Sequence, residues 1–241
     1  MVRSVHPLEE IVDHAPLFPP ASLSVPDALA EEARARASDQ AWLVGRFVAR
    51  ASHLRELGDV PLRLTVVLDD ADVALDDPRV EAVEVPPAVA ADVDVLVEEV
   101  YVERPVAGLA WLDEVAALGR RAKVRCGGES VPSVPELAAF VRRCRELGVP
   151  FKATAGLHHP VAAPGRHGFL NLLAAATFGD EEQALADEDP AAFALGEGRF
   201  AWRGHEADAA EIARVRREVF VSFGSCSIAE PVEDLEALGL L

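Results

Sequence analysis

The sequence predicts a single (β/α) barrel, with parallel strands and helices alternating over residues 1–241. Two observations support this fold class. From residue 42 onward, short runs rich in β-branched residues alternate with segments of helical periodicity, which is typical of βαβ units and a parallel sheet. Eight strand candidates in 241 residues also match the usual size of a (β/α)8 TIM-like barrel. No second linker and no internal repeat divides the chain, so we expect one domain.

Eight segments are expected as strands because they are short, apolar and bounded by glycine, proline or helical patterns. These segments are 43–49, 61–70, 80–86, 98–105, 122–128, 149–156, 199–204 and 219–227. The first and the seventh carry the weakest pattern. If either is absent, an open doubly wound parallel sheet replaces the barrel. Both architectures place functional side chains at the C-terminal ends of the strands, so the functional argument is common to both.

Residues 1–41 are expected to form an N-terminal extension, made of an arm and a helix. The segment 1–25 holds four prolines and no periodicity, which is typical of an extended arm packed on the surface. Ser24 followed by Pro26 predicts a helix over about 26–37. The other expected helices are 52–57, 109–118, 132–148, 169–179, 207–217 and 230–239, with the acidic segment 180–199 as an excursion or lid.

Charge and composition exclude several classes of partner. The formal net charge of −18 argues against nucleic acid and against an anionic membrane surface, since both need a basic face. Three cysteines without a CxxC spacing fit a reducing cytoplasm better than a disulfide framework. Acids in the first residues and the lack of a long uncharged run predict neither an export signal nor a membrane span. We therefore expect a cytoplasmic protein; no feature of the sequence indicates its oligomeric state.

Lysine is the rarest charged residue in the chain. Lys123 and Lys152 stand against 21 arginines. A position that remains lysine in such a composition indicates a need for an amine, because a guanidinium neither loses its proton nor forms an imine. The stretch Pro150–Asn171 around Lys152 also holds the only asparagine and three of the 7 histidines.

The two lysines are expected on one face of the barrel. Side chains two apart on a strand point the same way, so Lys123 points with Arg125, and Lys152 with Thr154. Neighbouring strands would gather both amines in a low-dielectric interior, where desolvation makes every ion costly. Two close amines depress each other's pKa, and a lysine with a depressed pKa is the usual nucleophile toward a carbonyl.

A structural ion-pair network is the alternative explanation of these lysines. Glu84 and Glu103 lie on the expected third and fourth strands and would supply the opposite charges. Such networks also fill barrel interiors and also perturb pKa values.

The segment KATAG (152–156) resembles the strand-six motif of the class I, Schiff-base aldolases related to deoxyribose-phosphate aldolase. In that motif, a lysine at a strand end precedes small or hydroxyl residues and a glycine. The resemblance implies a (β/α) barrel, an imine on Lys152 and a phosphorylated aldehyde product. The family's second lysine belongs on the following strand, whereas the comparable segment KVRCGG (123–128) lies on the preceding strand in this chain.

The turn GSCS (224–227) joins the last expected strand to a helix. Turns at this place in barrels often bind phosphate through backbone N–H groups, which makes Gly224 and Ser225 candidates for contact with an anion. Capping of the helix by Ser225 or Ser227 is an equal alternative. Arg125 would supply a side-chain clamp for phosphate or carboxylate.

The loop after segment 149–156 holds two adjacent histidines. On a loop, His158 or His159 can turn inward and act as a general acid or base, or both can lie on the surface. Asn171 is either the cap of the next helix or a site amide that reaches over the strand ends.

Metal binding is the competing role for a loop histidine. The other ligands would be a cysteine, Cys126 or Cys226, and a glutamate, Glu84 or Glu103. No recognised ligand spacing occurs, so we expect neither a metal nor another cofactor.

The expected function is therefore that of a lyase or isomerase acting on a small anionic carbonyl compound, with or without a phosphate group. Lys152 would form the imine, Lys123 would lower its pKa, and His158 or Glu103 would transfer protons. The expected binding residues are Arg125, Thr154, His159, Asn171, Gly224, Ser225 and Glu84. A metal-assisted enzyme that uses the two loop histidines, and a non-catalytic protein that binds an anionic metabolite, are the alternatives.

Overall fold

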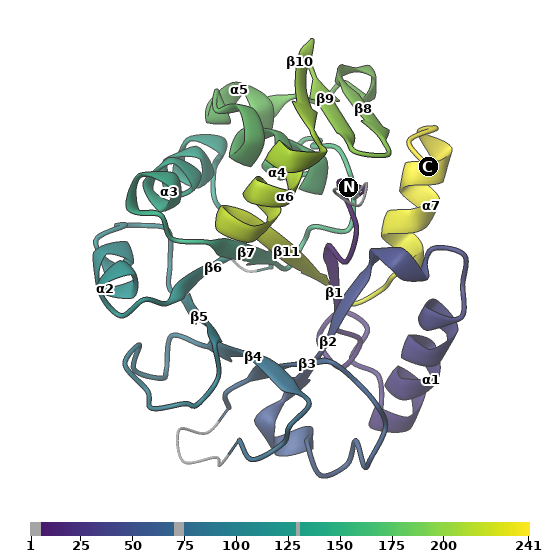
Figure 1. The fold of residues 1–241 in the computed structure, drawn as a ribbon, viewed down its shortest axis with the longest axis vertical. Coiled ribbons are helices and arrows are strands. Elements are labelled where there is room, and N and C mark those ends of the chain that lie inside the picture. Colours follow the sequence, from purple (N-terminus) through teal and green to yellow (C-terminus); the bar gives the residue numbers. More distant parts are fainter. Residues whose placement is uncertain (1–5, 70–74, 129–130) are drawn as a thin grey trace.

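The computed structural model describes residues 6–69, 75–128 and 131–241. They form a closed barrel of eight parallel strands in the order β1-β11-β7-β6-β5-β4-β3-β2 (Figure 1). The barrel strands are β1 (Val12–His14), β2 (Val44–Arg50), β3 (Leu64–Val67), β4 (Val80–Val85), β5 (Glu99–Glu103), β6 (Arg121–Arg125), β7 (Phe151–Thr154) and β11 (Phe220–Ser225). The expected (β/α)8 barrel is confirmed, and the open sheet is excluded.

The first barrel strand lies within the segment expected as a surface arm. In β1, Val12 pairs with Phe223 of β11 and with Val44 of β2, and all three β1 residues are buried. The expectation of an arm was wrong for these residues because a strand of three residues, two of them polar, produces no alternating pattern. The strand expected as the first is therefore the second, and each of the next five expected strands moves up by one place.

The segment expected as the seventh barrel strand belongs to a separate sheet. β9 (Arg199–Trp202) pairs antiparallel with β8 (Phe193–Gly196) and β10 (His205–Asp208). The hairpin turns between these strands contain Gly198 and Gly204, both with positive φ, which permits tight antiparallel reversals. The barrel closes without this segment because β1 fills the remaining place.

Helices surround most of the barrel (Figure 1). The α-helices are α1 (Val25–Arg36), α2 (Trp111–Ala117), α3 (Val134–Leu147), α4 (Phe169–Phe178), α5 (Glu181–Ala186), α6 (Ala209–Glu218) and α7 (Ala229–Ala237). The 3-10 turns are η1 (Ala41–Leu43), η2 (Ala51–His53) and η3 (Pro190–Ala192). The expected helix 52–57 is reduced to η2, and the described residues between β2 and β5 contain no α-helix. In the described part of the chain, no helix has the length and apolarity needed to cross a membrane.

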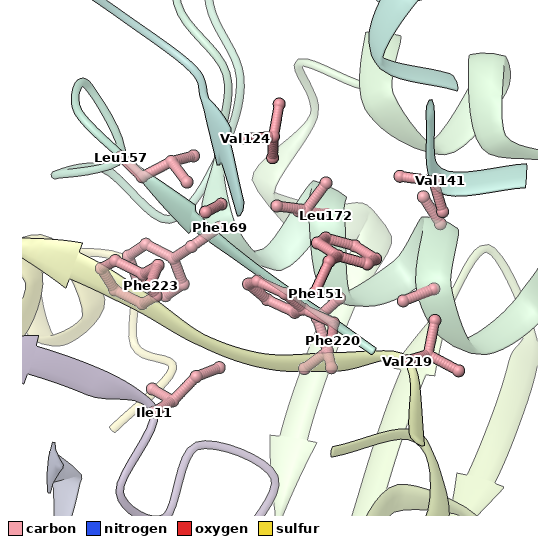
Figure 2. Close-up of a cluster of buried hydrophobic side chains, with 14 of the residues drawn as sticks. Ile11, Val124, Val141, Phe151, Leu157, Phe169, Leu172, Val219, Phe220 and Phe223 are labelled. Carbon is pink, nitrogen blue, oxygen red and sulfur yellow. The ribbon is translucent and has the colours of Figure 1, made fainter. Parts of the chain in front are cut away.

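A large part of the hydrophobic core lies between the strands and the helices around them. Phe151 of β7 stacks on Phe220 of β11 with ring centroids 5.4 Å apart, and Phe140 of α3 meets Phe151 edge-on at 5.2 Å. Figure 2 shows Phe151 and Phe220 in this layer, beside Leu172 and Val219. Because successive side chains on a strand alternate, Lys152 next to Phe151 points to the opposite side, into the barrel.

Candidate functional site

Five charged side chains form an alternating series across the interior of the barrel, which we call the charge chain. In spatial order they are Asp13, Lys152, Glu84, Lys123 and Glu103. The Nζ atom of Lys152 lies 2.5 Å from Oδ2 of Asp13 and 2.7 Å from Oε1 of Glu84. The Nζ atom of Lys123 donates to Oε2 of Glu84 and lies 2.8 Å from Oε2 of Glu103.

The charge chain connects strands that are not neighbours. Asp13 lies on β1, Lys152 on β7 and Glu84 on β4, so their contacts run through the interior rather than along the wall. Within the wall, Lys123 is the Cα partner of both Lys152 and Glu103. The fold therefore gathers four residues singled out from the sequence and adds Asp13.

The electrostatics of Lys152 oppose the expected depression of its pKa. Burial favours the neutral amine, but the carboxylates of Asp13 and Glu84 outweigh it and hold the pKa of Lys152 above its ordinary value. Burial alone would raise the pKa of Glu84. The positive charges of Lys123 and Lys152 outweigh this effect and lower the pKa to about 2. Lys152 is thus a charged group at neutral pH, and the carboxylates of Asp13 and Glu84 keep it so.

Asp13 is held in place by its neighbours. The hydroxyl of Ser222 donates to Oδ2 at 2.9 Å, and the backbone N–H of Arg46 donates to Oδ1 at 3.1 Å. A Cβ atom at Gly45 would lie 2.8 Å from Oδ1, so the glycine leaves room for this carboxylate. Sequence reasoning missed Asp13 because it lies in the segment taken as an arm.

A cavity of about 600 Å³ opens at the C-terminal ends of the barrel strands. Its wall includes residues at or near the ends of seven strands: Val48, Arg50, Val67, Glu84, Glu103, Lys123, Arg125, Thr154 and Gly224. Lys152 does not line the cavity and is 1% exposed, whereas Lys123 lines it and is 6% exposed. Of the two amines, Lys123 is therefore the one that a bound molecule can reach.

Two arginines lie on the cavity wall at strand ends. Arg125 is exposed at the end of β6, and the guanidinium of Arg50, at the end of β2, lies 4.9 Å from the ring centre of Phe18. Within the described part of the chain, neither arginine forms an ion pair with a carboxylate at 4.0 Å or less. Sequence reasoning identified Arg125 but missed Arg50, which carries no signal that separates it from the other arginines.

The cavity wall formed by the end of β7 is tightly constrained. Ala155 and Gly156 both have positive φ, of 59° and 73°. A Cβ atom at Gly127 would lie 2.8 Å from the Cα of Gly156, so the loops after β6 and β7 touch through their glycines. The buried Oγ1 of Thr154, on this wall, has no hydrogen-bond partner among the described residues. It is available to a polar group of a bound molecule.

The two loop histidines are separated by the structure. His158 lines the cavity, and its Nδ1 lies 3.2 Å from Oγ of Ser225 and 3.2 Å from Oε2 of Glu230. Burial lowers the pKa of His158, an effect that Glu230 partly opposes. His159 instead contacts Asp234 of α7 and does not line the cavity.

In the turn after β11, serine side chains accept hydrogen bonds from nearby backbone N–H groups. The N–H of Ser227 donates to Oγ of Ser225 at 3.3 Å, and the N–H of Glu230 donates to Oγ of Ser227 at 3.3 Å. Gly224 lines the cavity, but Ser225 is buried beside it and donates to the carbonyl of Ser227. This geometry favours the capping alternative for the turn over phosphate binding.

Asn171 has a structural position outside the cavity. Its Oδ1 accepts from the N–H of Ala162 at 2.8 Å, and its Nδ2 donates to the carbonyls of Ala184 and Asp187, both at 2.7 Å. The side chain is fully buried, and it ties the loop after β7 to α5. Asn171 therefore neither caps α4 by its side chain nor reaches the strand ends.

Asp69 and Asp70 follow the end of the expected second strand, a position that suits a site residue and the start of a turn equally. Asp69 accepts from both the N–H and the hydroxyl of Ser52 and does not line the cavity. Asp70 lies outside the described residues.

Comparisons with known proteins leave the site to be judged on its own geometry. No family model, no curated protein and no solved structure matched this chain.

Proposed function

We propose that this protein is a lyase or isomerase that acts on a small anionic carbonyl compound through an imine on Lys123. The observation that carries the proposal is the position of Lys123, which lines the cavity and whose amine lies between two carboxylates. A lysine is required for this chemistry and an arginine cannot replace it, which accounts for the retention of lysine at this position.

The geometry favours Lys123 over Lys152 as the nucleophile. An attacking amine must be neutral and must reach the carbonyl. Lys152 is almost fully buried below the cavity, and its carboxylate partners raise its pKa. Its role in the proposal is to hold a fixed positive charge against Glu84, which in turn orients Lys123.

Glu103 is the proposed proton acceptor. Glu84, with a pKa of about 2, stays ionised and is a poor base. Glu103 contacts the same amine at 2.8 Å and can take a proton from it. The neutral Nζ then adds to the carbonyl carbon. The carbonyl oxygen leaves as water with two protons, one returned by Glu103 and one lost from the lysine nitrogen after it has added, which leaves Glu103 as a carboxylate again. The resulting iminium ion withdraws electrons from the bond next to it, which is the bond that a lyase or isomerase breaks.

The cavity wall supports an anionic substrate. Arg125 and Arg50 offer guanidinium groups at the wall, and guanidinium pairs well with carboxylate or phosphate. The unpartnered Oγ1 of Thr154 and the imidazole of His158 supply neutral polar contacts. Because the N–H groups of Ser227 and Glu230 already donate to serine hydroxyls of the turn, the proposal assigns the anion to the arginines rather than to the turn.

The corrected strand order is consistent with the resemblance to Schiff-base aldolases. Lys123 lies on the sixth barrel strand and Lys152 on the seventh. That is the order which the resemblance implies, with the imine lysine on strand six and the second lysine on the following strand. The strand positions therefore favour Lys123 as the counterpart of the imine lysine, whereas the KATAG motif that carries the resemblance stays with Lys152 on the seventh strand.

Borohydride trapping with a panel of aldehydes and keto acids tests the proposal. With two lysines in the chain, peptide mapping by mass spectrometry assigns any adduct without ambiguity. We expect a reduced adduct on Lys123, and its loss in Lys123→Arg. The Lys152→Arg variant, checked for fold by circular dichroism, is the matched control.

The outcomes separate the proposal from its alternatives. An adduct on Lys152 would restore the assignment made from the sequence. No adduct on either lysine under any condition removes the imine mechanism, and ligand-induced stabilisation without turnover would then favour a binding protein.

The three cysteines, all free and buried, are consistent with the proposed cytoplasmic location.

A further inference from the structure

We infer that His158, Cys226 and Glu230 form a binding site for a transition-metal ion of the zinc type at the rim of the cavity. One ligand atom from each residue lies within 4.8 Å of the ligand atoms of the other two. Nδ1 of His158 and Oε2 of Glu230 lie 3.2 Å apart.

These separations suit a tetrahedral ion after a small side-chain movement. Zinc binds nitrogen and oxygen at roughly 2.1 Å and sulfur at about 2.3 Å, which places tetrahedral ligand atoms some 3.4–3.8 Å apart. The Glu230 side chain is 55% exposed on the first turn of α7, so its rotation displaces no packed neighbour.

The other two donors come from neighbouring barrel strands. His158 lies in the loop after β7 and Cys226 directly after β11, and these strands pair through Phe223 and Ala153. The constrained residues Ala155 and Gly156 lead into the histidine loop. Cys226 therefore directly follows a barrel strand, and His158 stands in a loop that begins with two conformationally constrained residues.

The charges around the site favour a cation. Among the described residues, the ion pairs of Glu230 involve His158 and no lysine or arginine. A thiolate, an imidazole and a carboxylate together form a donor set that prefers zinc, cobalt or nickel to magnesium or calcium.

The site opens toward the cavity. His158 and Cys226 both line the cavity, so three protein ligands would leave the remaining coordination position facing it. Catalytic zinc sites have this arrangement, whereas structural sites are closed by four protein ligands. An ion held there would accept an oxygen atom of the molecule in the cavity. The inference concerns binding alone and does not depend on the imine at Lys123.

Titration of the purified, metal-free protein with Co²⁺ tests the inference. Cobalt reports its own ligands, because a thiolate ligand adds a charge-transfer absorption band in the near ultraviolet. We expect saturation at one equivalent, displacement of Co²⁺ by Zn²⁺, and no competition from Ca²⁺. The charge-transfer band should be absent in Cys226→Ser.

Variants of the other two donors complete the test. His158→Ala and Glu230→Gln should each weaken Co²⁺ binding by at least about tenfold, since loss of even an outer partner of a ligand costs 10–100-fold. Cys144→Ala, which changes a buried cysteine of α3, is the matched control and should retain full binding. Circular dichroism establishes that each variant is folded.

Two results would overturn the inference. One is the absence of saturable Co²⁺ or Zn²⁺ binding by the unaltered chain. The other is a Co²⁺ spectrum in Cys226→Ser that matches that of the unaltered chain.

Discussion

Lys123 and Lys152 are Cα partners on adjacent strands, yet the carboxylate of Glu84 contacts both of their ammonium groups. The negative charge of Glu84 therefore compensates the repulsion between the two ammonium groups. Removal of one carboxylate should destabilise the whole charge chain. This relationship predicts how the barrel responds to substitution and to acid.

Asp13→Asn should destabilise the protein by roughly 3–5 kcal/mol, because breaking a buried ion pair leaves an uncompensated charge. Lys152 would then retain one carboxylate, Glu84. Urea denaturation measures the change, with Asp39→Asn on the surface after α1 as the matched control.

The double variant Asp13→Asn, Lys152→Met should be more stable than Asp13→Asn alone. Replacing both members of a buried pair with neutral groups removes the desolvation cost as well as the attraction. Equal or lower stability of the double variant would contradict the assignment of Asp13 as the partner of Lys152.

Stability should fall with acid over a window set by Glu84. Its pKa is lowered from 4.5 to about 2 in the folded protein. Such a group contributes stability above its unfolded pKa and loses it as the pH falls through the folded value, so the loss lies between about pH 4.5 and about pH 2. The contribution is roughly 3 kcal/mol by the usual conversion from pKa.

Denaturation at a series of pH values, compared with Glu84→Gln, measures this contribution. The variant should be less stable at neutral pH, and the part of the acid dependence that comes from Glu84 should disappear. Glu188→Gln, an exposed carboxylate beyond α5, should leave the curve unchanged.

Arg125→Gln should weaken binding of inorganic phosphate and of a simple keto acid by about tenfold or more. A hydrogen bond to a charged group contributes on the order of 1.5–3 kcal/mol, and Arg125 has no ion-pair partner among the described residues. Ligand-dependent shifts in melting temperature report the affinity. Arg34→Gln, on the exposed side of α1, is the control; an equal loss in both variants would contradict a specific role for Arg125.

Asn171→Ala should reduce stability by several kcal/mol without changing ligand affinity. The change leaves the N–H of Ala162 and the carbonyls of Ala184 and Asp187 without their partner, at about 1–3 kcal/mol for each buried group. Asn171→Asp keeps the acceptor but turns a carboxylate oxygen toward the two carbonyl oxygens, so it should be at least as destabilised as Asn171→Ala. Loss of ligand binding in a folded Asn171→Ala would instead return this residue to the site.

The strands of the barrel wall were largely predictable from the sequence, because a strand of four or more residues rich in apolar side chains can be recognised in a short window of sequence. The exception is β1, whose three residues include Asp13 and His14. Their burial depends on distant partners: Asp13 contacts Lys152, and Nδ1 of His14 lies 2.6 Å from Oε2 of Glu32. No local window of sequence contains such information.

The site was predictable where residue type and strand position coincide. Lys123, Arg125 and Thr154 all line the cavity, because each stands near the C-terminal end of an expected strand. His159 and Asn171 do not line it, because the path of a loop and of the helix after it is set by tertiary packing. Rarity singled out Asn171 correctly as a special residue but could not distinguish a buried structural amide from a site amide.

The pairing of β1 with β11 makes assembly of this site a late event in synthesis. Val12 pairs with Phe223, which lies more than two hundred positions later in the sequence. Asp13 can form its contacts with Lys152 and Ser222 only after both of these residues have been synthesised. Until residues 220–225 are made, β1 and β7 are unpaired edges, and the amine of Lys152 lacks part of its compensation. A nascent chain that stops short of β11 would therefore expose these edges to association with other chains.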